Sequence, residues 1–200
     1  MKCSSLLFSG RRGCLRAKRR RGSVALEFIL LFPVIVIAFL AVIEFSILAF
    51  LDQAATTALL EATRVGAAQF PPSLPLDSAG ADNDIADEIV KTINAHLATH
   101  RVEIVDPANG FTDDSTRANG FIRIERGASS VDRGSLPAGF SCTRTGAAPD
   151  TDEIVVTLCF PLVDPNTSSP NGLPVPNILS SFGLTLESFT FEMTSRETLD

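Results

Sequence analysis

The sequence predicts an α+β protein. In it, a long N-terminal transmembrane helix extends outside the membrane and leads into a small domain with one packing helix and a roughly four-stranded antiparallel sheet. Three observations predict this fold: a basic leader before a long apolar run, a later segment with an apolar residue at every fourth position, and then an apolar period of two. The expected parts are a cytoplasmic leader at 1–22, the helix and its extension at 23–70, and an extracytoplasmic α+β domain at 71–200.

Charge is distributed unevenly along the chain. The net charge is −6, yet residues 1–22 contain eight Lys or Arg and no acid, which leaves nine basic against 23 acidic side chains in residues 23–200. A basic cluster can bind nucleic acid by neutralising phosphates, but here an apolar run follows within a few residues. We therefore expect no nucleic-acid partner, because the positive-inside rule accounts for the cluster as a cytoplasmic anchor.

The apolar run extends from Phe28 to Leu51 and is interrupted only by Glu44 and Ser46. A helix of this length spans about 36 Å, enough to cross a hydrocarbon core of roughly 30 Å. The apolar core of a cleaved secretory signal is shorter, about 7–15 residues. We therefore expect a single-pass protein of the cytoplasmic membrane whose C-terminal domain is extracytoplasmic.

Helical periodicity continues beyond the membrane. The first helix should run to about Gln69 and end at "PPSLP", residues 71–75. Its apolar positions recur at spacings of three and four: Leu51, Ala55, Leu59, Ala62 and Val65. A second helix should begin within "DNDIADE", where Asp84 can cap exposed backbone N–H groups, and run to about Thr99. Its apolar face is formed by Ile85, Ile89, Ile93 and Leu97.

The rest of the chain has the period of β-strands. Four β-prone runs predict four antiparallel strands, at 101–105, 120–126, 152–160 and 184–195. Between the last two, "PLVDPNTSSPNGLPVPN" at 161–177 contains five prolines, and we expect it to be irregular.

Cysteines occur at both ends of the chain. Cys3 and Cys14 lie in the leader, whereas Cys142 and Cys159 lie in the part expected outside, and only the second pair would meet an oxidising compartment. We expect Cys142 and Cys159 to form a disulfide; two buried free thiols are the alternative.

The sequence contains no motif for catalysis. GxSxG, Walker and GxGxxG patterns are absent, and no CxxC suggests a metal site. His96 and His100 stand four apart, but no Glu follows the first and no third ligand is in view, so two solvated histidines are favoured over a zinc site. We expect no enzyme activity, no metal and no cofactor.

Two acids interrupt or border the apolar run. A carboxylate in the bilayer core costs about 2.5–3.5 kcal/mol on insertion scales, so such acids are usually paired, interfacial or functional. Glu27 follows the leader directly, and Glu44 lies 17 residues further, about 25 Å along the helix, so we place them near opposite interfaces. For Glu44 we favour a carboxylate that reaches the membrane surface.

The surroundings of Glu27 indicate more than an anchor. Gly22 ends the basic leader, an apolar helix follows, and Glu27 is the fifth residue counted from Ser23. This arrangement resembles the processing site of type IV prepilins and pseudopilins, which implies cleavage between Gly22 and Ser23 by a prepilin peptidase. The new amine of Ser23 would lie one helical turn from Glu27, where the opposite charges can pair within the chain or between neighbouring subunits.

The stretch from Gly22 to Ala68 resembles the TadE-like family of tight-adherence pilus assembly more specifically. Members begin with "VEFAL…P", carry a second Glu late in the span and continue with an Ala-rich "A…EA.R.AA" pattern. The tail "TFEMTSRE", residues 190–197, also resembles the family's closing strand. The matching residues in the helix are Glu27, Phe28, Pro33, Glu44, Ala54, Ala55, Glu61, Ala62, Arg64, Ala67 and Ala68.

The resemblance implies a bacterial protein that assists a tight-adherence (Flp-type) pilus by non-catalytic helix packing and an external interaction domain. Ser23 replaces the hydrophobic first residue common in major pilins, and the chain is longer than short fibre-forming pilins, so a minor pseudopilin or assembly factor fits better. Its partners would be the cytoplasmic membrane, other pilin-like or pilus-assembly proteins and prepilin peptidase. The rival hypothesis is a membrane-anchored extracytoplasmic ligand-binding or enzymatic domain unrelated to pili.

The charge pattern predicts the topology. Eight basic residues precede the span, and no Lys or Arg occurs between Val24 and Glu61, so the C-terminus should be outside the cytoplasm. A C-terminal alkaline phosphatase fusion should be active. An inactive phosphatase fusion together with a functional cytoplasmic reporter at the same position would contradict this topology.

Overall fold

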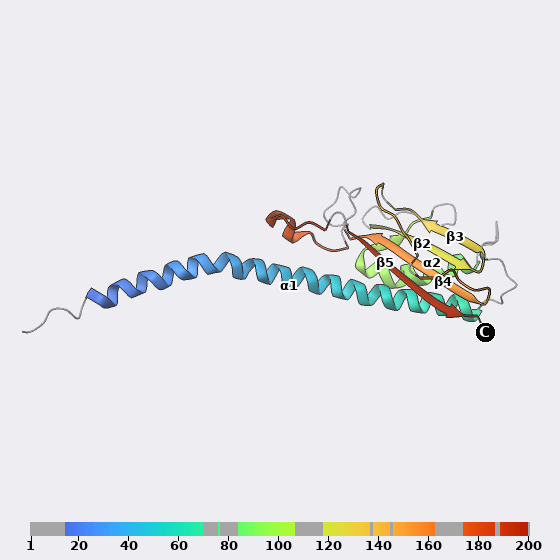
Figure 1. Ribbon diagram of the computed structural model, residues 1–200, viewed down its shortest axis with the longest axis horizontal. Coiled ribbons are helices and arrows are strands. Elements are labelled where there is room, and N and C mark those ends of the chain that lie inside the picture. The colour runs from blue at the N-terminus through green and yellow to red at the C-terminus, as the bar shows by residue number, and fades with distance from the viewer. Residues whose placement is uncertain are drawn as a thin grey trace, which may run out of the picture. The chain divides into compact units, whose positions relative to one another are not determined.

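The computed structural model describes residues 15–69, 76, 84–106, 118–136, 138–144, 146–162, 174–186 and 189–199, with side chains of the first helix described over 24–68. The chain divides into two units, Met1–Val42 and Ile43–Asp200, with the boundary inside the first helix. Figure 1 labels the main helices and strands. The elements in order are α1 (Leu15–Gln69), α2 (Ile85–Leu97), η1 (Ala98–His100), β1 (Val102–Ile104), β2 (Ala118–Arg126), β3 (Ser129–Gly134), β4 (Glu153–Pro161), η4 (Ile178–Phe182) and β5 (Thr190–Thr198).

Helix α1 changes its surroundings along its length. It ends at Gln69, as the sequence predicts, and begins at Leu15, within the basic leader. A stretch in Val24–Ala68 is long and apolar enough to cross a membrane. The large apolar side chains from Val24 to Val42 are mainly exposed, whereas from Leu51 onward one face is buried in the domain core. Of the five apolar positions that the sequence predicts on one face, Leu51, Ala55, Leu59 and Ala62 are at most 1% exposed, whereas Val65 is only partly buried.

Helix α2 is the packing helix that the sequence predicts. Asp84 has an extended backbone and its Oδ1 accepts the N–H of Asp87 at 2.9 Å, so it is the predicted N-cap. All four predicted apolar positions, from Ile85 to Leu97, are buried. The α-helix ends at Leu97, and a single 3₁₀ turn, η1, completes the segment expected to be helical.

The prediction of four antiparallel strands is wrong in two respects. The sheet has five strands in the order β1-β2-β4-β5, with β3 also paired to β2, and β1 runs parallel to β2 through the register Val102↔Ala118. Strand β3, "SSVDRG", lacks an alternating apolar pattern because it is a mainly exposed strand with one apolar residue, Val131. A tight turn at Gly127, with φ of 56°, pairs it with β2 nonetheless.

The last strand is also shorter than predicted. Strand β5 begins at Thr190, and Leu184 to Leu186 are irregular. The predicted irregular segment 161–177 begins one residue late, since Pro161 belongs to β4; its residues 163–173, like the helix stop at 71–75, lie outside the described residues.

The two faces of the sheet differ in chemistry. Residues that pair across β2, β4 and β5 alternate strictly, so that Ile122, Leu158 and Met193 share one face and Arg123, Thr157 and Thr194 the other. The first face belongs to the hydrophobic core with α2 and with α1 beyond Ile43. Strand β1 is tied to α2, because the Asn94 side chain donates to the carbonyl of Ile104 at 3.1 Å and accepts its N–H at 2.8 Å.

Helix α1 approaches both α2 and the sheet at Gly66. A Cβ atom built on Gly66 would lie 2.8 Å from Cδ1 of Ile89 in α2 and 3.0 Å from Cδ1 of Ile154 in β4. The absence of a side chain therefore sets the spacing between these three elements.

We expect Gly66→Val to destabilise the domain by about 1–3 kcal/mol, because a branched side chain overpacks this contact. Thermal unfolding of the full chain in detergent measures the effect, and Ala68→Val, at an exposed position two residues further, is the matched control. Equal melting temperatures for the two variants would show that Gly66 does not set the spacing.

Candidate functional site

The predicted processing residues lie together on α1. Gly22 and Ser23 are consecutive helical residues, and Glu27 follows Ser23 by four positions, one turn of helix. The Glu27 side chain is exposed. The neighbouring apolar side chains are exposed as well, with Ile29 at 70% and Phe39 at 67%. This part of α1 is therefore an apolar helical surface with one acid near its beginning.

Glu44 lies in different surroundings from those the sequence suggested. Its side chain is only 2% exposed, and its Oε2 accepts the backbone N–H of Leu179 at 3.0 Å. Leu179 is the second residue of η4, 135 positions further along the chain. The Glu44 carboxylate therefore does not extend along the helix to the membrane surface, as the sequence suggested. It binds the backbone of the domain instead.

The short helix η4 depends on this contact for its beginning. Asn177 precedes it without a side-chain capping bond, so the Glu44 carboxylate supplies an acceptor to its first turn. At the other end Gly183 has φ of 86°, and its N–H donates to Ser180 at 3.0 Å. Helix η4 was not predicted from the sequence. Its signal is "NILSSFG", in which Asn177 and Gly183 flank a short turn with three apolar residues.

An apolar groove lies beside the Glu44 contact. It has a volume of about 390 Å³ and opens to the outside of the domain. Phe45 and Leu48 of α1 line it together with Leu162, Leu184 and Phe189, and Glu44 is its single ionisable lining residue among those described. Phe45, Leu184 and Phe189 are more than half exposed.

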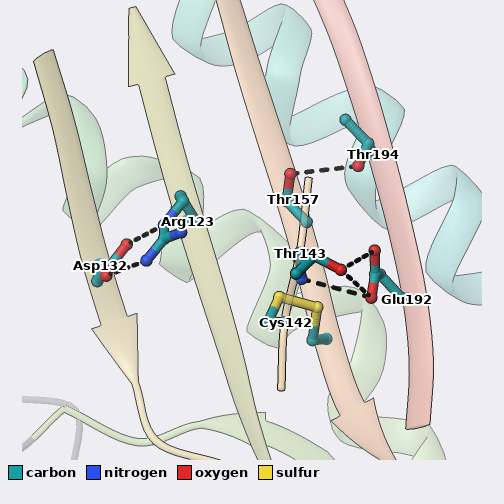
Figure 2. Close-up of a disulfide and its surroundings, with 8 residues drawn as sticks. Arg123, Asp132, Cys142, Thr143, Thr157, Glu192 and Thr194 are labelled. Carbon is teal, nitrogen blue, oxygen red and sulfur yellow. Dashed lines mark hydrogen bonds and ion pairs between the residues drawn. A yellow bond between two sulfur atoms is a disulfide. The ribbon is translucent and has the colours of Figure 1, made fainter. Parts of the chain in front are cut away.

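The structure joins Cys142 to Cys159 by a disulfide, with Cα atoms 5.8 Å apart, as the sequence analysis expects. Figure 2 shows this bond on the polar face of the sheet, next to the contact between Thr143 and Glu192. The bond fixes an irregular segment to β4 and closes a loop with a sequence separation of 17. In the chain-entropy model a loop of this length stabilises the domain by roughly 3 kcal/mol.

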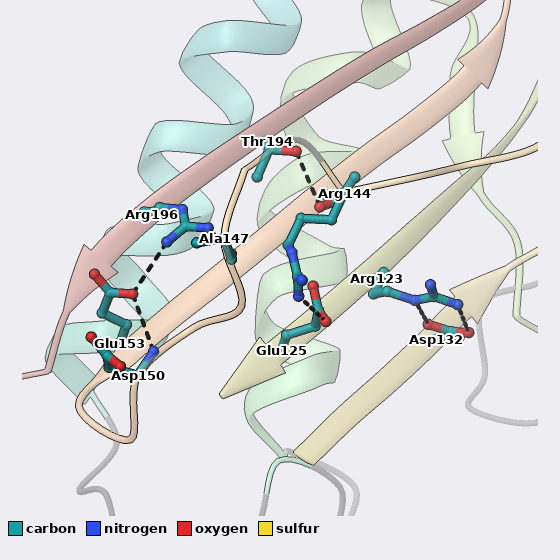
Figure 3. Close-up of polar contacts among 10 residues, drawn as sticks. Arg123, Glu125, Asp132, Arg144, Ala147, Asp150, Glu153, Thr194 and Arg196 are labelled. Carbon is teal, nitrogen blue, oxygen red and sulfur yellow. Dashed lines mark hydrogen bonds and ion pairs between the residues drawn. The ribbon is translucent and has the colours of Figure 1, made fainter. Parts of the chain in front are cut away.

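Ion pairs complete the attachment of that segment. Arg144 reaches Glu125 of β2 at 2.5 Å, and Arg196 of β5 contacts both Glu153 at 3.3 Å and the carbonyl of Ala147 (Figure 3). Acids and bases on this face are therefore arranged in structural pairs.

A second pairing on the polar face joins neighbouring strands. Arg123 of β2 makes a two-pronged contact with Asp132 of β3, at 2.8 Å for each bond (Figure 3). The hydrogen bonds that Arg123 donates to the Asp132 carboxylate raise the pKa of its guanidinium.

One buried arginine holds the beginning of α2 against the sheet. Arg133 of β3 is 5% exposed and points to the helix-covered face. Its Nη2 lies 3.7 Å from Asp84 Oδ2, and its Nε lies 3.8 Å from Asp87 Oδ1 and 3.4 Å from Asp106 Oδ2. The N-cap of α2 is thus also an ion-pair partner, and this network is structural.

The structure gives no support to metal binding by the two histidines. His96 lies in α2, but His100 lies in η1, so the four-residue spacing does not fall on one regular α-helix. Within the described residues no three His, Cys, Asp or Glu side chains are grouped as a metal site.

Comparison with known families covers the N-terminal helix. Residues 22–64 match the family model described as TadE-like protein, which confirms the resemblance over that stretch. No curated protein and no solved structure is similar enough to the chain to count as a match. The matched residues include Gly22, Glu27 and Glu44, and they end before α2 and the sheet.

We expect Glu44→Leu to release η4 from α1, because the buried N–H of Leu179 loses its charged acceptor. Such a hydrogen bond contributes about 1.5–3 kcal/mol, so the amides of Leu179, Gly183 and Leu184 should exchange with deuterium correspondingly faster. Glu44→Gln keeps an acceptor oxygen and should have a smaller effect.

Asp52→Leu is the control, since Asp52 is an exposed acid two turns further along α1. If the Leu179 amide were equally protected in Glu44→Leu and Asp52→Leu, the carboxylate would have no part in holding η4.

Proposed function

From the match of residues 22–64 to the TadE-like model, we propose that this chain is a membrane-anchored component of tight-adherence pilus assembly, either a minor pseudopilin or an assembly factor. It acts by packing its N-terminal helix against other pilin-like helices in the bacterial cytoplasmic membrane. Its external domain presents an interaction surface. The mechanism involves no catalysis by this chain.

One observation carries this proposal: the matched stretch is the helix, not the sheet. The match begins at Gly22 and ends at Arg64, whereas α2 and all five strands lie beyond it. The stretch that the family model matches is therefore the apolar helix with its two acids. A function shared with the family resides in that helix.

The exposure of the helix supports a role in lateral packing. Among the described residues, Phe28, Ile29, Phe32 and Phe39 are all more than half exposed, so no segment of the domain covers them. In a bilayer these side chains would face lipid or neighbouring helices. Apolar surface on all sides suits a helix that exchanges lipid contacts for contacts with several subunits.

Glu27 supplies a polar contribution to that packing. Cleavage after Gly22 would create a positive amine on Ser23, one turn from the Glu27 carboxylate. The pair can form within one chain or between neighbouring chains, and either arrangement offsets part of the cost of the acid near the hydrocarbon. A contact between chains would also set the relative depth of adjacent helices.

Processing is the first test. The protein isolated from cells with an active prepilin peptidase should have Ser23 as its first residue in intact-mass spectrometry. Gly22→Leu should block cleavage, because a bulky residue replaces the small one of the processing site, whereas Glu27→Ala should still be cleaved. A mature protein that retains residues 1–22 would contradict processing.

The proposed function itself is tested by complementation. Deleting the gene should abolish surface pili without loss of the pilin, and the intact gene should restore them. Glu27→Ala should restore them poorly, because the amine of Ser23 loses its partner. Asp52→Ala, an exposed acid on the same helix, should restore them fully.

Normal piliation after deletion would contradict the proposal. It would favour the rival hypothesis, a membrane-anchored external receptor or enzyme without a role in pili.

A further inference from the structure

We propose that the domain has a second contact with the membrane: the apolar groove between α1 and the η4 segment lies in the outer leaflet and receives lipid acyl chains. This inference rests on the proposed membrane span of α1. It adds a lipid-binding surface to a domain that the sequence places entirely in water.

The first observation is an uncharged, apolar surface that the domain leaves uncovered. Residues 174–186 contain no charged side chain. Three large apolar side chains that line the groove are exposed: Phe45 of α1 at 63%, Leu184 at 60% and Phe189 at 56%. Phe182, two residues before Leu184, is 49% exposed. Leaving these large side chains in water opposes the hydrophobic effect, and Phe and Leu are typical of segments that lie in the membrane interface.

The second observation is the position of this surface along α1. The stretch from Val24 to Ile43 contains 20 residues, about 30 Å of helix, which is the thickness of the hydrocarbon core. Glu44 is the next residue, and it binds Leu179 of η4 directly. The bond between Glu44 and Leu179 therefore keeps η4 at the level where α1 would leave the hydrocarbon.

The apolar run is longer than a membrane span requires, and a lipid contact of the domain explains the extra residues. The run continues from Phe45 to Leu51, beyond the number of residues that a span requires. Leu48 and Leu51 face the domain, with Leu51 1% exposed, while Phe45 and Phe50 are more than 60% exposed. One side of these two turns is thus occupied by the domain, and the other has the composition of a lipid-facing helix.

A bilayer fits this surface better than a protein partner. A stable protein interface buries about 800 Å² on each side with matched shape and polar groups, whereas the large exposed side chains that line this open groove are three, Phe45, Leu184 and Phe189, with Thr185 beside them. Lipid chains adapt to the groove and need no polar partners. The one acid that lines it, Glu44, is only 2% exposed and its Oε2 accepts the N–H of Leu179, so this side chain is buried in the domain and is not part of the exposed apolar surface.

The chain contains no Trp and no Tyr, so a single introduced Trp reports its own surroundings. We would place one Trp in four full-length variants: Phe182→Trp and Leu184→Trp in the proposed contact, Phe32→Trp in the span, and Leu60→Trp as control. Leu60 is 44% exposed and lies 16 residues beyond Glu44 on α1. Each variant is reconstituted in phosphatidylethanolamine and phosphatidylglycerol vesicles, with and without bromine atoms on the acyl chains.

The proposal expects brominated lipid to remove most of the emission of Phe182→Trp and Leu184→Trp, as it does for Phe32→Trp, and both spectra to be shifted to the blue. Leu60→Trp should keep its emission. Two contact variants are used so that the result does not depend on the folding of one.

If Phe32→Trp is quenched while Phe182→Trp and Leu184→Trp keep their emission, the lipid contact is refuted and the span stands. Blue-shifted emission without quenching would assign the patch to a second copy of the chain, and red-shifted emission would leave it in water; both refute the proposal. Unquenched Phe32→Trp would instead refute the membrane span on which the proposed function also depends.

Discussion

The structure depends on one constraint: a single apolar helix must have its surface covered in two different ways. Beyond Leu51, α1 buries Ala55, Leu59 and Ala62 against its own domain. Before Ile43 the described part of the chain provides no such cover, so the apolar side chains need lipid or neighbouring helices. Each large apolar side chain removed from water contributes about 1.5–3 kcal/mol, which makes both kinds of cover necessary for the helix. The same element thus contains a stretch long and apolar enough to cross a membrane and also contributes to the core of the domain.

Glu44 marks the place where one kind of cover gives way to the other. An acid at this position would be costly in lipid, but the domain supplies a backbone donor from Leu179 and buries the carboxylate. The contact joins residues 135 positions apart and brings η4 beside the emerging helix. The two acids of the matched helix therefore differ: under the proposed function Glu27 would serve packing between chains, whereas Glu44 joins α1 to η4 of its own domain.

Local patterns allowed much of this fold to be predicted, and non-local pairing limited the rest. The end of α1, the Asp84 cap and the inward positions of α2 follow from helix periodicity and capping. Strand β3 and the parallel β1 could not be predicted, because β3 has one apolar residue and the direction of a three-residue strand depends on its partner. The burial of Glu44 was missed for the same reason: its partner is a backbone N–H in a segment without a strong pattern. The disulfide between Cys142 and Cys159 could be predicted, because the expected topology places only these two cysteines outside the cytoplasm.

The central claim is that the two halves of α1 owe their stability to different surroundings, and hydrogen exchange under denaturant tests it most directly. The full-length protein in lipid nanodiscs would be titrated with urea while amide protection is followed along α1, α2 and β4. Isolated helices in water are marginally stable, so the amides of 44–69 should lose protection at the same urea concentration as β4, while those of 24–42 remain protected by the bilayer. Protection of 44–69 that persists after β4 has unfolded would contradict the claim and show that this half of the helix does not depend on the domain.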